Sequence, residues 1–246
     1  MIVIPMAGNS SRFYAAGFSR PKYELEIGGQ SLFSLTVRSF EAYFESEKFL
    51  FIVRAEFAAK GFVEESCRAL GVSNYEIVEL ATPTRGQAET VLLGMTGATY
   101  RRDEALLVFN VDTIRPGYTL PPEAANADGY LEVFRAQGDH WSFVRPLSPT
   151  SKLVAATAEK RRISDLCCTG LYYFASAADF VSVCTAAIDN FSEFEKEWRE
   201  LYIAPMYNAL IAKGRRITYH EVPASEVLLA GTPDEFEALV SQQVQT

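Results

Sequence analysis

A short apolar strand that runs directly into a turn of small residues is the feature that most constrains this chain. Met1–Pro5 has the composition of a buried strand. The turn behind it consists of Ala7, Gly8, Asn9, Ser10 and Ser11. Backbone N–H groups of such a turn can close around phosphate oxygens, and Arg12 and Lys22 add fixed positive charge. The segment therefore predicts a grip for a triphosphate.

Two common phosphate-binding loops do not fit this turn. It contains no Gly-x-x-x-x-Gly-Lys-Ser/Thr and no Gly-x-Gly-x-x-Gly. A strand followed by a small polar turn is frequent in α/β proteins of every kind, so an ordinary turn is the alternative interpretation. The segments that follow decide between the two.

Helix and strand patterns alternate through the first half of the chain. Helical spacing of apolar residues occurs at 31–44, 58–70 and 87–96, and strand patterns occur at 49–53, 75–80 and 105–111. This alternation predicts a mostly parallel sheet with helices on both faces.

The second half changes character. Strand patterns at 129–134, 141–145, 152–157 and 167–174 are separated by short turns, which predicts a small antiparallel extension. Helices are expected at 177–189 and 195–213, and Thr232-Pro233-Asp234-Glu235 announces a last one with a capping Thr and a Glu three residues later. No linker divides the sequence, so residues 1–246 are expected to form one three-layer α/β/α, Rossmann-like domain.

Charge and cysteine usage exclude several classes of protein. The net charge of −8 and the isoelectric point near 5.0 argue against a nucleic-acid or membrane-surface binder. With neither a basic leader nor an apolar run long enough for a bilayer, the expected location is cytoplasmic. The cysteines lack metal-ligand spacing and are expected to be buried reduced thiols; they are Cys67, Cys167, Cys168 and Cys184.

The stretch from Gly8 to Arg12, followed by Pro21 and Lys22, resembles the signature loop of sugar-phosphate nucleotidylyltransferases, which is usually Gly-x-Gly-Thr/Ser-Arg and then Pro-Lys. The resemblance extends to about Phe236 and implies a GT-A-type fold. Residues 1–125 would then bind the nucleotide and 126–246 the acceptor. Ser10 stands where the family usually has its second glycine, so the backbone is expected to approach the phosphates less closely.

The expected reaction moves a nucleotidyl group from an NTP to a small phosphorylated acceptor, with release of pyrophosphate. A divalent cation is the usual means of neutralising the phosphates. Asp112 follows an apolar strand at the edge where open α/β sheets bind ligands, and in the resembled family the Asp at this position holds Mg²⁺. A strand-terminal Asp that caps the next turn is the alternative. Arg12, Lys22 and Asp112 are therefore the catalytic candidates.

Four further residues are candidates for substrate binding. Gln87 opens a helix and is the candidate for the nucleobase, although a helix start alone would explain its neighbours. The resemblance implies that Lys160 binds the acceptor's phosphate and Glu159 its hydroxyl or amine groups; a solvated strand end is the alternative. Gly170, in an apolar strand, either floors the acceptor pocket or marks a bulge, and the two interpretations carry equal weight.

One departure concerns the metal. Many members of the resembled family carry a second metal-binding Asp where this chain has Leu229, and an apolar side chain cannot bind Mg²⁺. Either Asp112, phosphate oxygens and water complete the shell, or another carboxylate such as Glu226 does, or activity is impaired. The segments 140–143 and 203–208 look like a subgroup found with capsule or lipopolysaccharide genes, whose members often lack this Asp, and this favours a working enzyme that supplies an activated precursor of a surface polysaccharide.

Several alternatives stay open. The nucleotide is CTP by mild preference, with dTTP or UTP as alternatives, and the acceptor is a sugar 1-phosphate or a similar small phosphate. A non-catalytic nucleotide sensor or scaffold would also fit Ser10 and Leu229, whereas a GT-A glycosyltransferase should show an Asp-x-Asp motif that Asp112-Thr113-Ile114 lacks. The aromatic residues Phe194, Trp198 and Tyr202 are assigned to the core or to the interface of a homo-oligomer, with a lid over the acceptor as the alternative.

Overall fold

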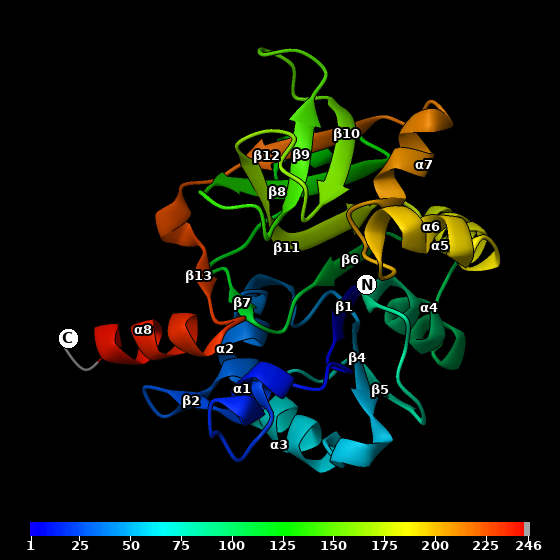
Figure 1. Ribbon diagram of the computed structural model, residues 1–246. Coiled ribbons are helices and arrows are strands. Elements are labelled where there is room, and N and C mark those ends of the chain that lie inside the picture. Colours follow the sequence, from blue (N-terminus) through cyan, green and yellow to red (C-terminus); the bar gives the residue numbers. More distant parts are fainter. Residues whose placement is uncertain (244–246) are drawn as a thin grey trace.

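The first strand of the chain lies in the middle of a large mixed sheet (Figure 1). The computed structural model describes residues 1–243. The parallel strands are β1 Ile2–Pro5, β4 Phe49–Arg54, β5 Tyr75–Leu80 and β6 Leu106–Phe109. Their order is β6-β1-β4-β5, so the chain builds outward from β1 on one side and then returns to its other side with β6.

The second half of the chain extends this sheet. Its strands are β8 Gly129–Arg135, β9 Ser142–Pro146, β10 Val154–Glu159, β11 Leu166–Phe174 and β12 Ile217–Glu221. β11 pairs antiparallel with β6, β8 and β9, and β10 pairs antiparallel with β9. The predicted α/β fold with an antiparallel extension is therefore confirmed. β12, which pairs in parallel with β8, is absent from the sequence-based expectations.

Two small sheets lie apart from the main one. They are β2 Glu26–Ile27 with β3 Gln30–Ser31, and β7 Thr113–Ile114 with β13 Leu228–Leu229. The pairing of β7 with β13 brings the C-terminal segment beside the residues that follow β6.

Helices cover both faces of the main sheet, because the side chains of its buried strands alternate. In β4, Leu50 and Ile52 pack in one apolar cluster with the helices α4 (Gln87–Gly97), α5 (Ala177–Asp189) and α7 (Met206–Ala212). Phe49, Phe51 and Val53 pack in a second cluster with α2 (Leu32–Arg38) and α3 (Lys60–Leu70). Each such side chain, fully buried, contributes about 1.5–3 kcal/mol. The three predicted layers follow from this alternation.

The helices are α1 Ser11–Ala15, α2 Leu32–Arg38, α3 Lys60–Leu70, α4 Gln87–Gly97, α5 Ala177–Asp189, α6 Phe191–Trp198, α7 Met206–Ala212 and α8 Pro233–Gln243. Short 3₁₀ turns occur at Lys22–Glu24, Glu41–Tyr43, Ala55–Phe57, Pro122–Ala124 and Ala224–Glu226. The predicted capping of α8 is confirmed: Glu235 N donates to Thr232 Oγ1 at 3.3 Å, and Thr232 N donates to Glu235 Oε2 at 2.9 Å.

The helix expected over 31–44 is shorter than predicted. α2 ends at Arg38, and Ser39 then accepts hydrogen bonds from the loop that follows β7. Its hydroxyl accepts from Arg115 N at 2.9 Å, and its carbonyl accepts from Tyr118 N at 3.1 Å. These contacts with a remote segment end the helix before the apolar pattern does.

The single helix expected over 195–213 is wrong. The structure has two helices there, α6 and α7, and Arg199 ends α6 with a φ of +64°. The residues between them pair with another part of the chain, since Leu201 N donates to the Arg85 carbonyl and the Leu201 carbonyl accepts from Ala88 N. Pro205 then precedes α7. Backbone pairing with a distant segment has overridden the local helical spacing.

All four cysteines lie within the described residues, are buried and are free, as predicted. Cys167 and Cys168 belong to different apolar clusters, which places the two side chains on opposite faces of β11. Within residues 1–243, no helix combines the length and the apolar character needed to cross a membrane.

Two helical glycines provide a test of this packing. A Cβ at Gly94, in α4, would overlap the side chain of Ile52, whereas a Cβ at Gly61, in α3, would meet nothing within 4 Å. Gly94→Ala should therefore lower the free energy of unfolding by about 1–3 kcal/mol through overpacking. Gly61→Ala should leave it unchanged or raise it by about 0.5–1 kcal/mol, because alanine is the better helix former. Urea unfolding followed by circular dichroism measures both, and equal effects would contradict the packing of α4 on β4.

Candidate active site

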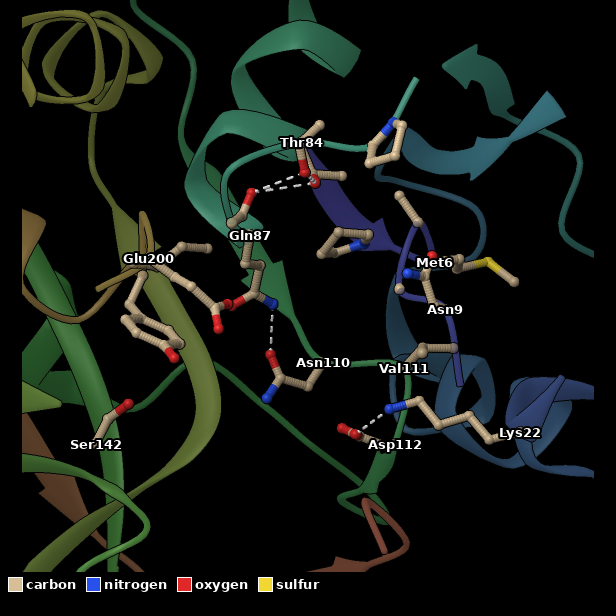
Figure 2. A pocket seen from close by; sticks show the side chains of 18 of the residues that line it. Met6, Asn9, Lys22, Thr84, Gln87, Asn110, Val111, Asp112, Ser142 and Glu200 are labelled. Carbon is tan, nitrogen blue, oxygen red and sulfur yellow. Dashed lines mark hydrogen bonds and ion pairs between the residues drawn. The ribbon is translucent and has the colours of Figure 1, made fainter. Parts of the chain in front are cut away.

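A cleft of about 510 Å³ opens where the strand order reverses, at the carboxyl ends of β1 and β6. Both halves of the sequence line it. The first half contributes the loop after β1, the start of α4 and the residues after β6, and the second half contributes the end of β10 and the segment between α6 and α7. Figure 2 shows side chains from these elements pointing into one cavity.

The predicted phosphate loop lines one side of this cleft. Ala7, Gly8, Asn9 and Arg12 face it, whereas Ser10 and Ser11 are not among its lining residues. Ser10 adopts a left-handed conformation with a φ of +50°, which a glycine would reach at less cost. Its hydroxyl accepts from Lys22 N at 3.2 Å. The serine that replaces the family's glycine therefore keeps the turn and ties it to the Pro-Lys segment.

Lys22 and Asp112 form an ion pair across the cleft, with Nζ 2.5 Å from Oδ2 (Figure 2). Both side chains are largely buried, at 19% and 20% exposure. Burial alone would raise the pKa of Asp112, but the charge and the hydrogen bond of Lys22, helped by the more distant Arg12, outweigh it and hold that pKa below its usual range. Asp112 is therefore ionised and able to bind a cation.

Arg54 is a further cation of this side that sequence analysis missed. It is the last residue of β4, only 4% exposed, and it lines the cleft. Its Nη1 donates to Asn9 Oδ1 at 3.3 Å, its Nη2 pairs with Glu56, and its buried Nε has no partner among the described residues. Its position at the end of an apolar strand could have indicated from the sequence that Arg54 lies at the ligand-binding edge of the sheet.

The carboxylates near the cleft limit how a metal ion could be held. Within residues 1–243, no group of three His, Cys, Asp or Glu side chains is placed to bind one. Leu229 packs beside an apolar cluster, and Glu226 pairs with Arg115 at 3.0 Å instead of facing the cleft. Asp112 together with substrate phosphates fits Mg²⁺, which is usually bound by one or two carboxylates and keeps several waters.

Gln87 lies at the start of α4 and reaches the residues after β6. Its Nε2 donates to Asn110 Oδ1 at 2.6 Å, and both residues line the cleft (Figure 2). Gly170 is not among the lining residues: it lies behind Asn110, in β11, where the pairing with β8 shifts register and where its φ is +95°. Sequence analysis missed Asn110, although a polar residue two positions before Asp112 marked it.

The two residues predicted to bind the acceptor, Glu159 and Lys160, lie together at the opposite end of the cleft. Glu159 accepts from the hydroxyl of Ser142, and Lys160 Nζ donates to the hydroxyl of Tyr202 at 2.6 Å while lying 4.7 Å from that ring's centre. Burial raises the pKa of Glu159, and the hydroxyl bond from Ser142 offsets this only in part. Burial would lower the pKa of Lys160, but its contacts with Tyr202 outweigh this and raise it. His140 and Glu200 also line this end and were missed by sequence analysis.

The aromatic cluster expected on one helix is divided between two environments. Trp198 is buried near the end of α6, and Phe194 packs against the main apolar cluster. Tyr202 lies in the segment between α6 and α7 and lines the cleft. It reaches Lys160 from a segment whose backbone is paired with the start of α4.

The fold recurs in solved structures over the whole length of the chain. A nucleoside-diphosphate-sugar pyrophosphorylase from Vibrio cholerae RC9 is 48% identical over 98% of this chain and 100% of that chain, with a TM-score of 0.93. A putative glucose-1-phosphate thymidylyltransferase from Bacillus anthracis is 14% identical, with coverages of 100% and 95% and a TM-score of 0.77. An inositol-1-phosphate CTP transferase from T. maritima is 15% identical, with coverages of 98% and 95% and a TM-score of 0.70. At identities of 14% and 15%, the last two similarities show a shared fold and nothing further. No protein-family model and no curated protein matches the sequence.

The half-buried carboxylate of Glu159 predicts a pH-dependent change in stability. Because its pKa is raised in the folded protein, ionisation costs stability as the pH rises from about 4.5 through the folded pKa. Glu159→Gln should therefore unfold at a higher temperature than the wild type at pH 8, and the difference should shrink towards pH 4.5. Thermal unfolding across this range measures it. Glu65→Gln, which removes the same charge from an exposed position on α3, is the control, and a difference independent of pH would contradict the prediction.

Proposed function

The chain belongs to the sugar-phosphate nucleotidylyltransferase family, and from this premise we propose that it uses Mg²⁺ to transfer NMP from an NTP to a small phosphorylated acceptor. Pyrophosphate is the second product. The observation that carries the proposal is the ion pair of Lys22 with Asp112, beside Arg12 and the loop after β1, in the cleft where the strand order reverses. Positive charge for a triphosphate and a carboxylate for a cation thus lie within one hydrogen bond of each other.

The residues of the cleft suggest how the reactants are held. Asp112 would hold Mg²⁺ together with phosphate oxygens, and the bound ion would neutralise charge on the phosphates. Lys22, released from Asp112, has its ammonium free for the triphosphate, and Arg12 and the backbone of the loop bind further oxygens. An oxygen of the acceptor's phosphate attacks the α-phosphorus as the bond to the bridging oxygen of pyrophosphate breaks. No protein nucleophile takes part.

The other end of the cleft is the proposed binding site for the acceptor. Lys160 would bind the acceptor's phosphate, and Glu159 would accept hydrogen bonds from its hydroxyl or amine groups. On this basis residues 1–125 form the nucleotide-binding half and residues 126–246 the acceptor-binding half, of which 244–246 lie outside the described part. Cleft residues from both halves support this division, because Gln87 and Asp112 come from the first and Glu159 and Lys160 from the second.

The substrates are proposed at the level of class. CTP is the favoured nucleotide, with dTTP and UTP as alternatives, and a sugar 1-phosphate or a similar small phosphate is the acceptor. The names of the solved neighbours pair thymidylyl transfer with glucose 1-phosphate and CTP with inositol 1-phosphate, so this fold serves different bases and acceptors. We further propose that the product is an activated precursor of a capsule or lipopolysaccharide.

A screen with matched variants tests the reaction. Purified protein with MgCl₂ is assayed for pyrophosphate release with each NTP against pooled sugar phosphates and amino-alcohol phosphates. Lys22→Ala should lower kcat/KM by about 100-fold or more, because it removes a charge that faces the triphosphate. Lys48→Ala is the control, since it breaks a lysine–carboxylate pair outside the cleft, with Glu76, and should leave turnover unchanged.

The same screen can contradict the proposal in two ways. Near-normal turnover of a folded Lys22→Ala variant would remove the role assigned to this cation. Absence of pyrophosphate release from the wild type with every pair, together with nucleotide binding, would favour the non-catalytic sensor instead.

A further inference from the structure

We propose that Asn110 is a positioning residue that sets which hydrogen-bonding group Gln87 presents to the nucleobase. This inference rests on the proposed function, because it assumes that Gln87 faces the base of a bound NTP. It adds a residue outside the phosphate grip and outside the acceptor end. The ligand feature that it would select is a base edge with an N–H donor.

The contact between the two amides is direct. Gln87 Nε2 donates to Asn110 Oδ1 at 2.6 Å, and both side chains face the cleft (Figure 2). The glutamine comes from the first residue of α4 and the asparagine from the turn after β6, so the bond joins two elements 23 residues apart in sequence. Each amide alone could rotate and offer either its oxygen or its nitrogen. The bond couples the two orientations: while Asn110 presents Oδ1 to Gln87, Gln87 presents Nε2 to Asn110.

The backbone behind Asn110 holds its side chain in place. Asn110 N donates to the carbonyl of Gly170 at 3.1 Å. A Cβ at Gly170 would lie 2.5 Å from Asn110 Nδ2, and the φ of +95° at Gly170 also disfavours a side chain. The bulge in β11 therefore provides the space that the asparagine amide occupies. This explains the close approach that a glycine in an apolar strand signals.

The consequence concerns the outer edge of Gln87. With Nε2 engaged by Asn110, the Oε1 of Gln87 has no hydrogen-bond partner among the described residues and is free to accept one from a ligand. A pyrimidine offers a matching donor as the 4-amino group of cytosine or as the N3–H of uracil or thymine, and these donors occupy different positions on the ring. A fixed acceptor distinguishes them, whereas an amide free to rotate would serve both edges.

The inference predicts a separation of two binding energies. The triphosphate contacts lie at Arg12, Lys22 and Asp112, and the Lys22–Asp112 pair makes no hydrogen bond with Gln87 or Asn110. Loss of the amide pair should therefore weaken discrimination between bases, and the affinity for the triphosphate should stay unchanged. A purely structural role for Asn110 would instead weaken both.

Calorimetry with magnesium measures the two separately. The probes are CTP, UTP and dTTP, which share one triphosphate, and inorganic tripolyphosphate, which has no base. For the wild type, the ratio of the tightest to the weakest nucleotide Kd reports discrimination. Asn110→Leu keeps the volume and removes the acceptor, so this ratio should fall about tenfold, or to near 1, while the Kd for tripolyphosphate changes less than about twofold.

A conservative variant should restore the discrimination between nucleotides. Asn110→Asp keeps an acceptor oxygen for Gln87 Nε2, so it should retain the wild-type ratio. Its added charge beside Asp112 weakens all three nucleotides alike and cancels in the ratio. An unchanged ratio in Asn110→Leu, or equal loss in both variants, would overturn the inference. Equal binding of every nucleotide by the wild type would overturn it while leaving the proposed function, whereas no binding of any nucleotide would overturn the proposed function as well.

Discussion

The ion pair between Lys22 and Asp112 is the contact on which the rest of the cleft depends. It joins the segment after β1 to the segment after β6, 90 residues apart, where the strand order reverses between β6 and β4 around β1. Each of these charges is largely buried, and a charge left without its partner there would be strongly destabilising. Within the cleft these two charges therefore neutralise each other. A bound triphosphate and its cation would replace each partner with another of the same sign, so binding need not leave either charge uncompensated.

The cations that line the cleft suggest how an acidic protein could bind a polyanion. The chain carries a net charge of −8, and a general attraction for phosphates is therefore absent. Positive charge is instead gathered in the cleft, where Arg12, Lys22 and Arg54 lie on the side of the loop after β1 and Lys160 lies at the other end. Arg54 is held by Asn9 of the phosphate loop, which links this buried cation to the turn that sequence analysis had singled out. Cations in a partly buried cleft attract a phosphate strongly when it is in contact with them. Salt screens their attraction for a nucleic acid that stays outside the cleft.

The parts of the structure that depend on neighbouring residues could be predicted from the sequence. The strands at 49–53 and 75–80 and the capping of α8 by Thr232 and Glu235 follow local patterns, and each was confirmed. The failures have a common cause in partners remote in sequence. Ser39 ends α2 because residues near 115 bond to it, and Leu201 interrupts the expected helix because Arg85 and Ala88 pair with its backbone. Asn110, Arg54 and Glu200 were missed in the same way, since only the strand order brings them to one cleft.

The segment between α6 and α7 couples the two ends of this cleft. Gly86 has a φ of +151°, and a Cβ there would lie 2.5 Å from Leu201 N, so the start of α4 can exist in this form only with a glycine against that backbone. Gln87 follows Gly86 in the chain, and Tyr202 follows Leu201. The candidate for the base and a contact of Lys160 are thus one residue away from the same pair of backbone hydrogen bonds. Tyr202 therefore belongs to a segment that backbone hydrogen bonds fix to the start of α4, and a displacement of either end of the cleft would strain the same two bonds.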